Sequence, residues 1–145
     1  ESGEAAAYVT DFPDDELLGV EGVTAIPHLG ASTPESEDNC ASMAVEELKD
    51  YLENGNIRNS VNMPAVSMPR AEGLIRICIL HRNVPNTISL FSGAVGNAGV
   101  NIENMQSMSR GDYAYTIFDV SGDLADDAVT SLAGMEPIIR VRVIR

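Results

Sequence analysis

The order of apolar patterns in the C-terminal half most constrains how this chain can fold. The run LIRICILH alternates Ile75, Ile77 and Ile79 with other residues, which is typical of a strand with one strongly apolar face. Further along, apolar residues recur at helical spacing in two places. Three more runs are predicted strands, and the one at 113–120 is rich in aromatic and β-branched residues. The predicted order is strand, helix, strand, strand, helix, strand, over residues 74–81, 85–99, 100–109, 113–120, 123–135 and 137–144.

This βαββαβ order is that of the ferredoxin-like split unit, in which two helices cover one face of a four-stranded sheet. A domain as small as residues 73–145 buries a limited share of its surface and is only marginally stable by itself. We therefore expect the uncovered sheet face, or a sheet edge, to pair with a second copy. A homo-oligomer, at least a dimer, is the predicted state.

Residues 1–60 read as a different structural unit, joined to the rest by a linker at 61–72 that contains two prolines. A short apolar run covers 5–9, and VTAIPH, residues 23–28, is a candidate buried strand. A helix is predicted to follow, with a capping box formed by Ser32 and Glu35 and an end at Gly55. Two strands and one helix cannot bury a core. The fold class is therefore α+β, with an incomplete α/β remnant before the βαββαβ domain.

Charge and hydropathy exclude several classes of partner. The net charge is −13, of which the first 60 residues carry −12. Such a surface repels nucleic acid phosphates and anionic membranes, so neither is expected as a partner. The apolar runs are too short to span a bilayer, and no signal peptide is recognised, so a cytoplasmic protein with two reduced cysteines is expected.

His28 is the first candidate for a functional residue, because an ionisable ring ends the apolar run before PHLGAST. Acids in the loop 11–16 are candidates to approach the ring, and a His–carboxylate pair orients the tautomer for proton transfer. The alternative is a strand-end His that hydrogen-bonds locally. The glycines at 93, 96 and 99 do not have the spacing of a dinucleotide-binding loop. The sequence also shows no cluster of metal ligands near His28.

The second candidate site is HRNVPN, residues 81–86, where the first strand of the βαββαβ unit meets its first helix. Backbone N–H groups at a helix start attract a carboxylate. His81 and Asn83 add hydrogen-bonding side chains, and Asn101 begins the neighbouring strand and is expected to point at the same spot. The alternative is ordinary turn chemistry, since Asn and Pro are common in turns.

The motifs together resemble a known family. VTDFPDDELLGVEGVTAIPHLGASTPESEDN and NGNIRNSVNMP are similar to the C-terminal part of the catalytic region of D-3-phosphoglycerate dehydrogenases. LHRNVPNTI and AGVNIENMQ are similar to motifs of the ACT domain that closes the regulated members, which would cover 73–145. The resemblance extends over essentially the whole chain.

For the catalytic region, the resemblance implies that His28 matches the general acid/base that acts on the 2-hydroxyl of 3-phosphoglycerate while a hydride passes to NAD. Asp15 matches the supporting carboxylate, with Glu16 as the alternative, and Asp11 matches a residue on the nicotinamide side. The family's nucleotide loop and catalytic Arg would precede residue 1. The chain is therefore expected to be a fragment of a longer enzyme, inactive alone and without a cofactor of its own.

For the ACT domain, the resemblance implies feedback inhibition by L-serine, the end product of the pathway, with contacts at His81, Asn83 and Asn101. We expect the serine to bind between two copies of this domain, at the start of the helix after Pro85. Arg82 and Asn86 depart from the family pattern and leave the identity of the amino acid open. Two other hypotheses remain at this point: a catalytic chain completed by a separate polypeptide, and an oligomerisation module without a small ligand.

Overall fold

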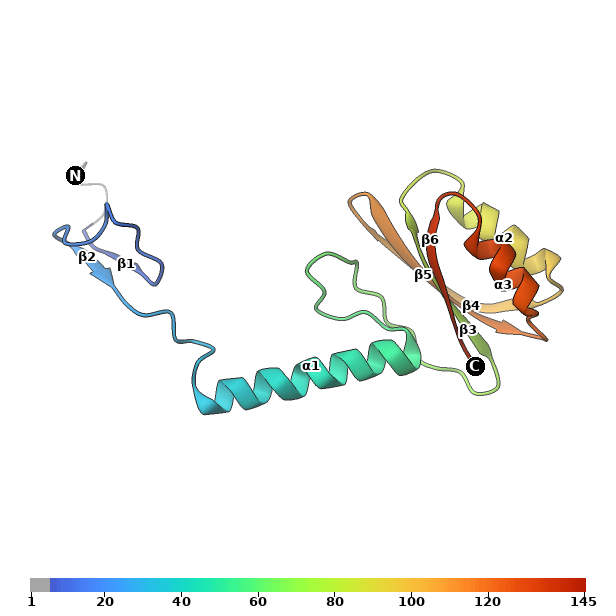
Figure 1. Ribbon diagram of the computed structural model, residues 1–145, viewed down its shortest axis with the longest axis horizontal. Helices are drawn as coiled ribbons and strands as arrows, with labels where there is room; N and C mark the ends of the chain where they lie inside the picture. The colour runs from blue at the N-terminus through green and yellow to red at the C-terminus, as the bar shows by residue number, and fades with distance from the viewer. Residues whose placement is uncertain (1–5) are drawn as a thin grey trace. The chain divides into compact units, whose positions relative to one another are not determined.

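The computed structural model describes residues 6–145, which form two compact units that divide between Ala44 and Val45. The first unit holds two short strands and the beginning of a helix, and the second holds a four-stranded sheet with two helices (Figure 1). The elements are β1 (Tyr8–Thr10), β2 (Val23–Ala25), α1 (Pro34–Asn54), β3 (Ile75–Arg82), α2 (Thr87–Asn97), β4 (Asn101–Arg110), β5 (Tyr113–Ser121), α3 (Asp126–Ala133) and β6 (Ile138–Ile144).

The second unit confirms the ferredoxin-like fold predicted for 73–145. Its sheet has the order β4-β5-β3-β6, and all neighbouring strands are antiparallel. Both β3 and β4 are therefore antiparallel to β5, so they run parallel to each other with one strand between them. This direction decides which residues meet at each end of the sheet.

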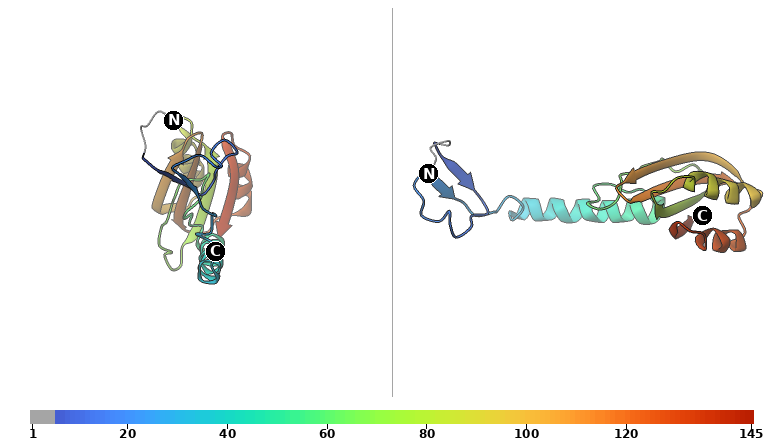
Figure 2. Two further views of the ribbon diagram at one scale, coloured as in Figure 1. Left: turned by 90° about the vertical axis from the view of Figure 1, so that its left-hand side faces the viewer. Right: turned by 90° about the horizontal axis from the view of Figure 1, so that it is seen from above.

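One face of the sheet carries the main core, under α2 and α3. The two helices lie side by side on that face (Figure 2). The alternation in β3 points Ile77 and Ile79 at the helices, and their side chains are at most 1% exposed. The other buried members of this core are Phe91, Val95, Val100, Phe118, Val120, Leu124 and Leu132.

The sequence suggested that a second copy pairs with the opposite face of the sheet or with a sheet edge. In the structure, residues of the same chain cover this face. Residues after α1 pack on it, with Ile57 and Val66 forming a backbone bridge and Val66 buried against Cys78 and Ile117 of the sheet. The predicted linker 61–72 is thus partly a packed cover. This is why the second compact unit begins at Val45, within α1, and not after the linker.

A buried arginine joins this cover to the sheet. Arg76 of β3 is fully buried and forms a two-pronged ion pair with Asp119 of β5, at 2.7 and 2.8 Å. Its remaining guanidinium N–H groups donate to the backbone carbonyls of Asn54, Met68 and Pro69, each at 2.8 Å. One side chain therefore fixes the end of α1 and the end of the cover to two central strands.

Two further contacts hold the C-terminal end of α1. The hydroxyl of Tyr115 donates to the carbonyl of Gly55 at 2.8 Å, and Arg142 of β6 donates to the carbonyls of Tyr51 and Leu52. The carbonyl of Leu52 is among the groups that a helix leaves without internal partners at its C-terminus, whereas the carbonyl of Tyr51 also accepts from the backbone N–H of Gly55 at 2.9 Å. The sheet thus caps the helix with side chains from two of its strands.

In the first unit, β1 and β2 pair in parallel, with Tyr8 opposite Val23. Ala5, at the start of the predicted run 5–9, lies outside the described residues. Within residues 6–145, no helix combines the length and the apolar character that a bilayer crossing requires.

The helix ends differ in detail from the sequence prediction. α1 begins at Pro34, but Thr33 and not Ser32 is its cap, because the Thr33 hydroxyl accepts from the backbone N–H of Ser36 at 3.2 Å. α3 begins at Asp126, three residues after the predicted cap Asp123, and no side chain caps it. α1 ends as predicted, at a Gly55 with φ of 75°.

Candidate functional site

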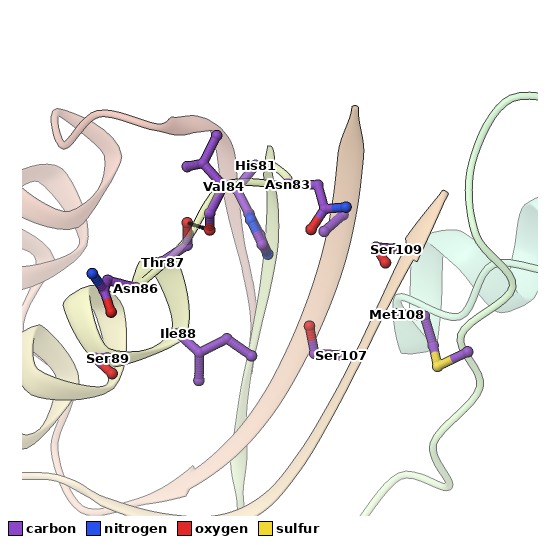
Figure 3. A pocket seen from close by; sticks show the side chains of 11 residues that line it. His81, Asn83, Val84, Asn86, Thr87, Ile88, Ser89, Ser107, Met108 and Ser109 are labelled. Atoms are coloured by element: carbon purple, nitrogen blue, oxygen red, sulfur yellow. Dashed lines mark hydrogen bonds between the residues drawn. The ribbon is translucent and has the colours of Figure 1, made fainter. Parts of the chain in front are cut away.

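A pocket of about 380 Å³ lies between the start of α2 and the last residues of the edge strand β4 (Figure 3). Its walls come from the β3–α2 turn, the first turn of α2, the end of β4 and the start of β5. It is lined by His81, Asn83, Val84, Asn86, Thr87, Ile88, Ser89, Ser107, Met108, Ser109 and Ala114. None of these side chains is a carboxylate, Lys or Arg, so the pocket favours a ligand without net charge.

His81 forms the inner wall and is only 3% exposed. Its Nδ1 is 2.9 Å from the carbonyl oxygen of Arg82, and its Nε2 is 3.0 Å from the hydroxyl of Thr116. The ring also contacts Phe91 edge to face, with centroids 5.2 Å apart. Both ring nitrogens are thus partnered within the chain, and the ring is fixed in orientation.

The start of α2 supplies donors for an anion. Asn86 has a left-handed backbone, φ 64°, and its side chain does not cap the helix. The N–H groups of the first turn therefore have no side-chain partner, and the helix dipole favours a negative group there. Thr87 does not cap the helix either, because its hydroxyl donates back to the carbonyl of Val84 at 2.7 Å.

Asn83 lies at the mouth of the pocket and is exposed. Its amide nitrogen donates to the carbonyl of Gly111 at 3.0 Å, and its backbone N–H donates to the carbonyl of Asp112. These two bonds tie the β3–α2 turn to the β4–β5 turn. The amide oxygen of Asn83 is left as an acceptor.

Asn101 does not reach this pocket within one chain. It pairs with Ser121 at the far end of β4, whereas Ser109, opposite Ala114, is at the pocket end. Eight residues of strand at about 3.3 Å each separate Asn101 from Ser109 by roughly 26 Å. Within one chain Asn101 therefore does not lie near His81 and Asn83, and the predicted contact of all three residues with one ligand requires a second copy.

Asn101 instead takes part in a small polar cluster. Its amide donates to the Glu103 carboxylate at 2.9 Å, and the Ser121 hydroxyl donates to the same oxygen at 2.5 Å. The bonds from Ser121 and Asn101 lower the pKa of the Glu103 carboxyl. In one copy, the amide oxygen of Asn101 remains available on the edge of the sheet.

The first unit places His28 beside an acid of the 11–16 loop. The Nδ1 atom of His28 lies 2.5 Å from the Asp11 carboxylate, and the ring packs on Phe12 with centroids 4.5 Å apart. Both members of the pair are about half exposed. The contact lies within the predicted loop 11–16. The resemblance gave the supporting role to Asp15, with Glu16 as the alternative, but within the described residues neither of these forms a side-chain hydrogen bond.

Two residues were missed from the sequence: Ser107, which lines the pocket, and Thr116, which lies behind the pocket wall. Thr116 is fully buried, and its hydroxyl forms hydrogen bonds with two groups. It lies 3.0 Å from Nε2 of His81 and 2.7 Å from the hydroxyl of Ser107. The signal was present: Thr116 follows Ala114 on the helix-facing side of an otherwise apolar strand, where a hydroxyl needs a buried partner. No cluster of three His, Cys, Asp or Glu side chains suited to a metal occurs in the part of the chain described.

Comparison with known proteins identifies relatives of one kind. No family model matches the chain. D-3-phosphoglycerate dehydrogenase of Haemophilus influenzae is 30% identical over 128 residues, which are 88% of this chain and 31% of that protein. The Escherichia coli K12 enzyme is 28% identical over 88% of the chain, and D-3-phosphoglycerate dehydrogenase 2 of Saccharomyces cerevisiae is 32% identical over 73%.

This chain is thus homologous to part of the D-3-phosphoglycerate dehydrogenases, and it spans between 23% and 32% of the length of these relatives. Among solved structures, the regulatory subunit of aspartate kinase from Thermus thermophilus matches 56% of the chain and 57% of its own, at 15% identity and a TM-score of 0.44. The quorum-quenching acylase GqqA matches 61% of the chain and 46% of its own, at 18% identity and a TM-score of 0.42.

Proposed function

We propose that residues 73–145 form an ACT-type regulatory domain of a D-3-phosphoglycerate dehydrogenase and bind L-serine. Residues 1–60 are then a part of the catalytic region of that enzyme, which works with NAD in the cytoplasm. The 145 residues contain no Gly-rich dinucleotide loop, so no step through NAD is assigned to them. The pocket at the start of α2 is the observation that carries the regulatory proposal.

The groups of the pocket match those of a zwitterionic amino acid. The uncapped first turn of α2 offers N–H donors for the carboxylate. The amide oxygen of Asn83 is an acceptor for the ammonium, and hydroxyls of β4 lie within the same pocket. A pocket without charged side chains suits a ligand whose two charges cancel.

The position of Asn101 favours a ligand held between two copies. β4 is an edge strand, and Met105 and Met108 on it are each 48% exposed. If two copies pair through antiparallel β4 strands about a two-fold axis near Met105, Asn101 of one copy lies level with Ser109 of the other. His81 and Asn83 of one copy and Asn101 of its mate would then lie at the same end of the joined sheet, with the His81 ring as a wall of the pocket.

Titration calorimetry and thermal denaturation with L-serine test this proposal. Serine at about 100 times its dissociation constant should stabilise the fold by roughly 2.7 kcal/mol. Asn101→Ala should abolish that stabilisation, and the control Asn97→Ala, at the exposed end of α2 and outside the pocket, should keep it. L-alanine should bind about tenfold more weakly, because a buried polar group loses its partner.

Two results would contradict the regulatory proposal. Absence of any serine effect at tens of millimolar would favour an oligomerisation module without a ligand. An unchanged effect in Asn101→Ala would mean that two copies do not share the pocket in this way.

We further propose that His28 supplies the general acid/base of the parent dehydrogenase, with Asp11 as the carboxylate that orients it. The 2.5 Å contact at Nδ1 supports this role, because it leaves Nε2 to exchange a proton with a substrate hydroxyl. The rings of His28 and Phe12, packed on each other, further restrict the imidazole. His28 and Asp11 are each about half exposed in this unit.

The test uses the complete enzyme that contains these residues. Asp11→Asn and His28→Gln should each reduce kcat, the latter by about 10²–10⁴-fold, with a smaller change in KM. Asp15→Asn tests the alternative assignment and should change kcat much less. A larger loss in Asp15→Asn than in Asp11→Asn would return the role to Asp15.

A further inference from the structure

The hydroxyl of Ser107 donates its proton to Thr116, so toward the ligand it can only accept a hydrogen bond. We propose that Ser107 is a specificity-determining residue of the pocket, which accepts a hydrogen bond from the ammonium or hydroxyl group of the ligand and disfavours a carboxylate at that point. The inference rests on the proposed function, since it concerns the amino acid that the pocket takes.

The two ring nitrogens of His81 have different partners. Nδ1 faces the carbonyl oxygen of Arg82 at 2.9 Å, and a carbonyl oxygen can only accept. Nδ1 therefore carries the proton. In the neutral form of the imidazole, Nε2 is then the acceptor.

The acceptor role of Nε2 then fixes which atom donates in the two hydrogen bonds of Thr116. Thr116 must donate its one proton to Nε2 of His81, across 3.0 Å. Its oxygen therefore accepts from Ser107, across 2.7 Å, and this bond uses the one proton of Ser107. Thr116 is fully buried and His81 nearly so. Water therefore has little access to offer either group another partner.

Ser107 thus meets the pocket with lone pairs only. In Figure 3 it lies on the side of β4 that faces α2, across from Ile88, whereas Met108 points the other way. The opposite wall, at the first turn of α2, offers N–H donors. The two walls therefore have opposite polarity, which orients a zwitterion with its carboxylate toward α2 and a donor toward β4.

Variants at Thr116 separate this relay from simple loss of a hydroxyl. Thr116→Ser keeps the relay, and we expect its L-serine affinity, measured by calorimetry at pH 8, to stay within about threefold of wild type. Thr116→Val removes the acceptor for Ser107 and leaves the Ser107 proton free to point into the pocket. We expect affinity to fall about tenfold or more in Thr116→Val and in Ser107→Ala, since a hydrogen bond to a buried group is lost in each.

Ser92→Ala is the matched control, because Ser92 lies on α2 outside the pocket and bonds only within its own helix. Melting temperatures without ligand show whether each variant is folded. In the ligand-free protein, ¹⁵N NMR of the His81 ring should show a protonated Nδ1 and an unprotonated Nε2 that accepts a hydrogen bond.

The outcomes separate this inference from the proposed function. Wild-type binding of L-serine with unchanged affinity in Ser107→Ala or Thr116→Val overturns the inference and leaves the proposed function intact. A protonated Nε2 also overturns it. Absence of L-serine binding by the wild type overturns both.

Discussion

The buried pair Arg76–Asp119 offers the sharpest test of how the cover is held on the sheet. Asp119→Asn keeps the shape of the side chain and removes its charge, so Arg76 stays buried without a counter-ion. Loss of one partner of a buried ion pair costs about 3–5 kcal/mol. For a unit of about 100 residues, at roughly 4–8 °C per kcal/mol, the melting temperature should fall by at least about 12 °C.

The double variant Arg76→Met/Asp119→Leu tests whether the bonds of Arg76 to backbone carbonyls stabilise the fold in addition to the ion pair. An ordinary buried pair is often replaced by apolar residues with no loss of stability, or with a gain of about 1–4 kcal/mol. Here the guanidinium also serves the carbonyls of Asn54, Met68 and Pro69, which the double variant leaves without their donor. At about 1–3 kcal/mol for each buried group left unpaired, the double variant should remain less stable than wild type.

Thermal and urea denaturation at one fixed protein concentration measure both effects, because oligomerisation makes stability depend on concentration. Arg145→Met is the control, since its contact with Asp126 is exposed and should be worth about 1 kcal/mol or less. A double variant at least as stable as wild type would refute the role assigned to the three carbonyls. An Asp119→Asn protein as stable as wild type would refute the importance of the pair itself.

Three further predictions follow from the fold and the sequence. Sedimentation of the 145-residue chain should show at least a dimer at high micromolar concentration, and a monomer with and without serine would contradict pairing through β4. The same polypeptide alone should produce no NADH from NAD and 3-phosphoglycerate, since it has no Gly-rich loop, and measurable turnover would favour a catalytic polypeptide. Burial raises the pKa of the Cys78 thiol, whereas Cys40 is exposed; in a Cys40→Ser protein, a thiol reagent at pH 8 should therefore react only as fast as the fold opens, and prompt reaction would contradict the packed cover.

The C-terminal fold was predictable because its signals are local. Alternation in 74–81 placed β3 within one residue of its observed bounds, Ile75–Arg82, and helical spacing placed the stripe of α2 on Phe91 and Val95. The cover was not predictable in the same way. The segment that contains Val66 has prolines and no period, and its burial depends on the open face of a sheet distant in the sequence.

Two features of the candidate site could not be derived from the sequence, each for a specific reason. Asn101 was placed near His81 because both flank strand ends, but β3 and β4 run parallel, so the start of β4 lies beside the start of β3 and not beside its end. The partner of His28 depends on how the loop after β1 returns to β2. Sequence spacing alone did not separate Asp11 from Asp15 within that loop.

The two faces of the central strands connect the pocket to α1. On β5, Thr116 points toward the pocket, and its neighbour Tyr115 points the other way and holds the carbonyl of Gly55. On β3, His81 lines the pocket and Arg76 holds the end of α1. A ligand can regulate only if it binds two arrangements of the protein with different affinity. A shift of β3 or β5 under the pocket also moves Arg76 and Tyr115, which hold the C-terminal end of α1. We therefore expect ligand binding in the pocket to act on the end of α1 through these two strands.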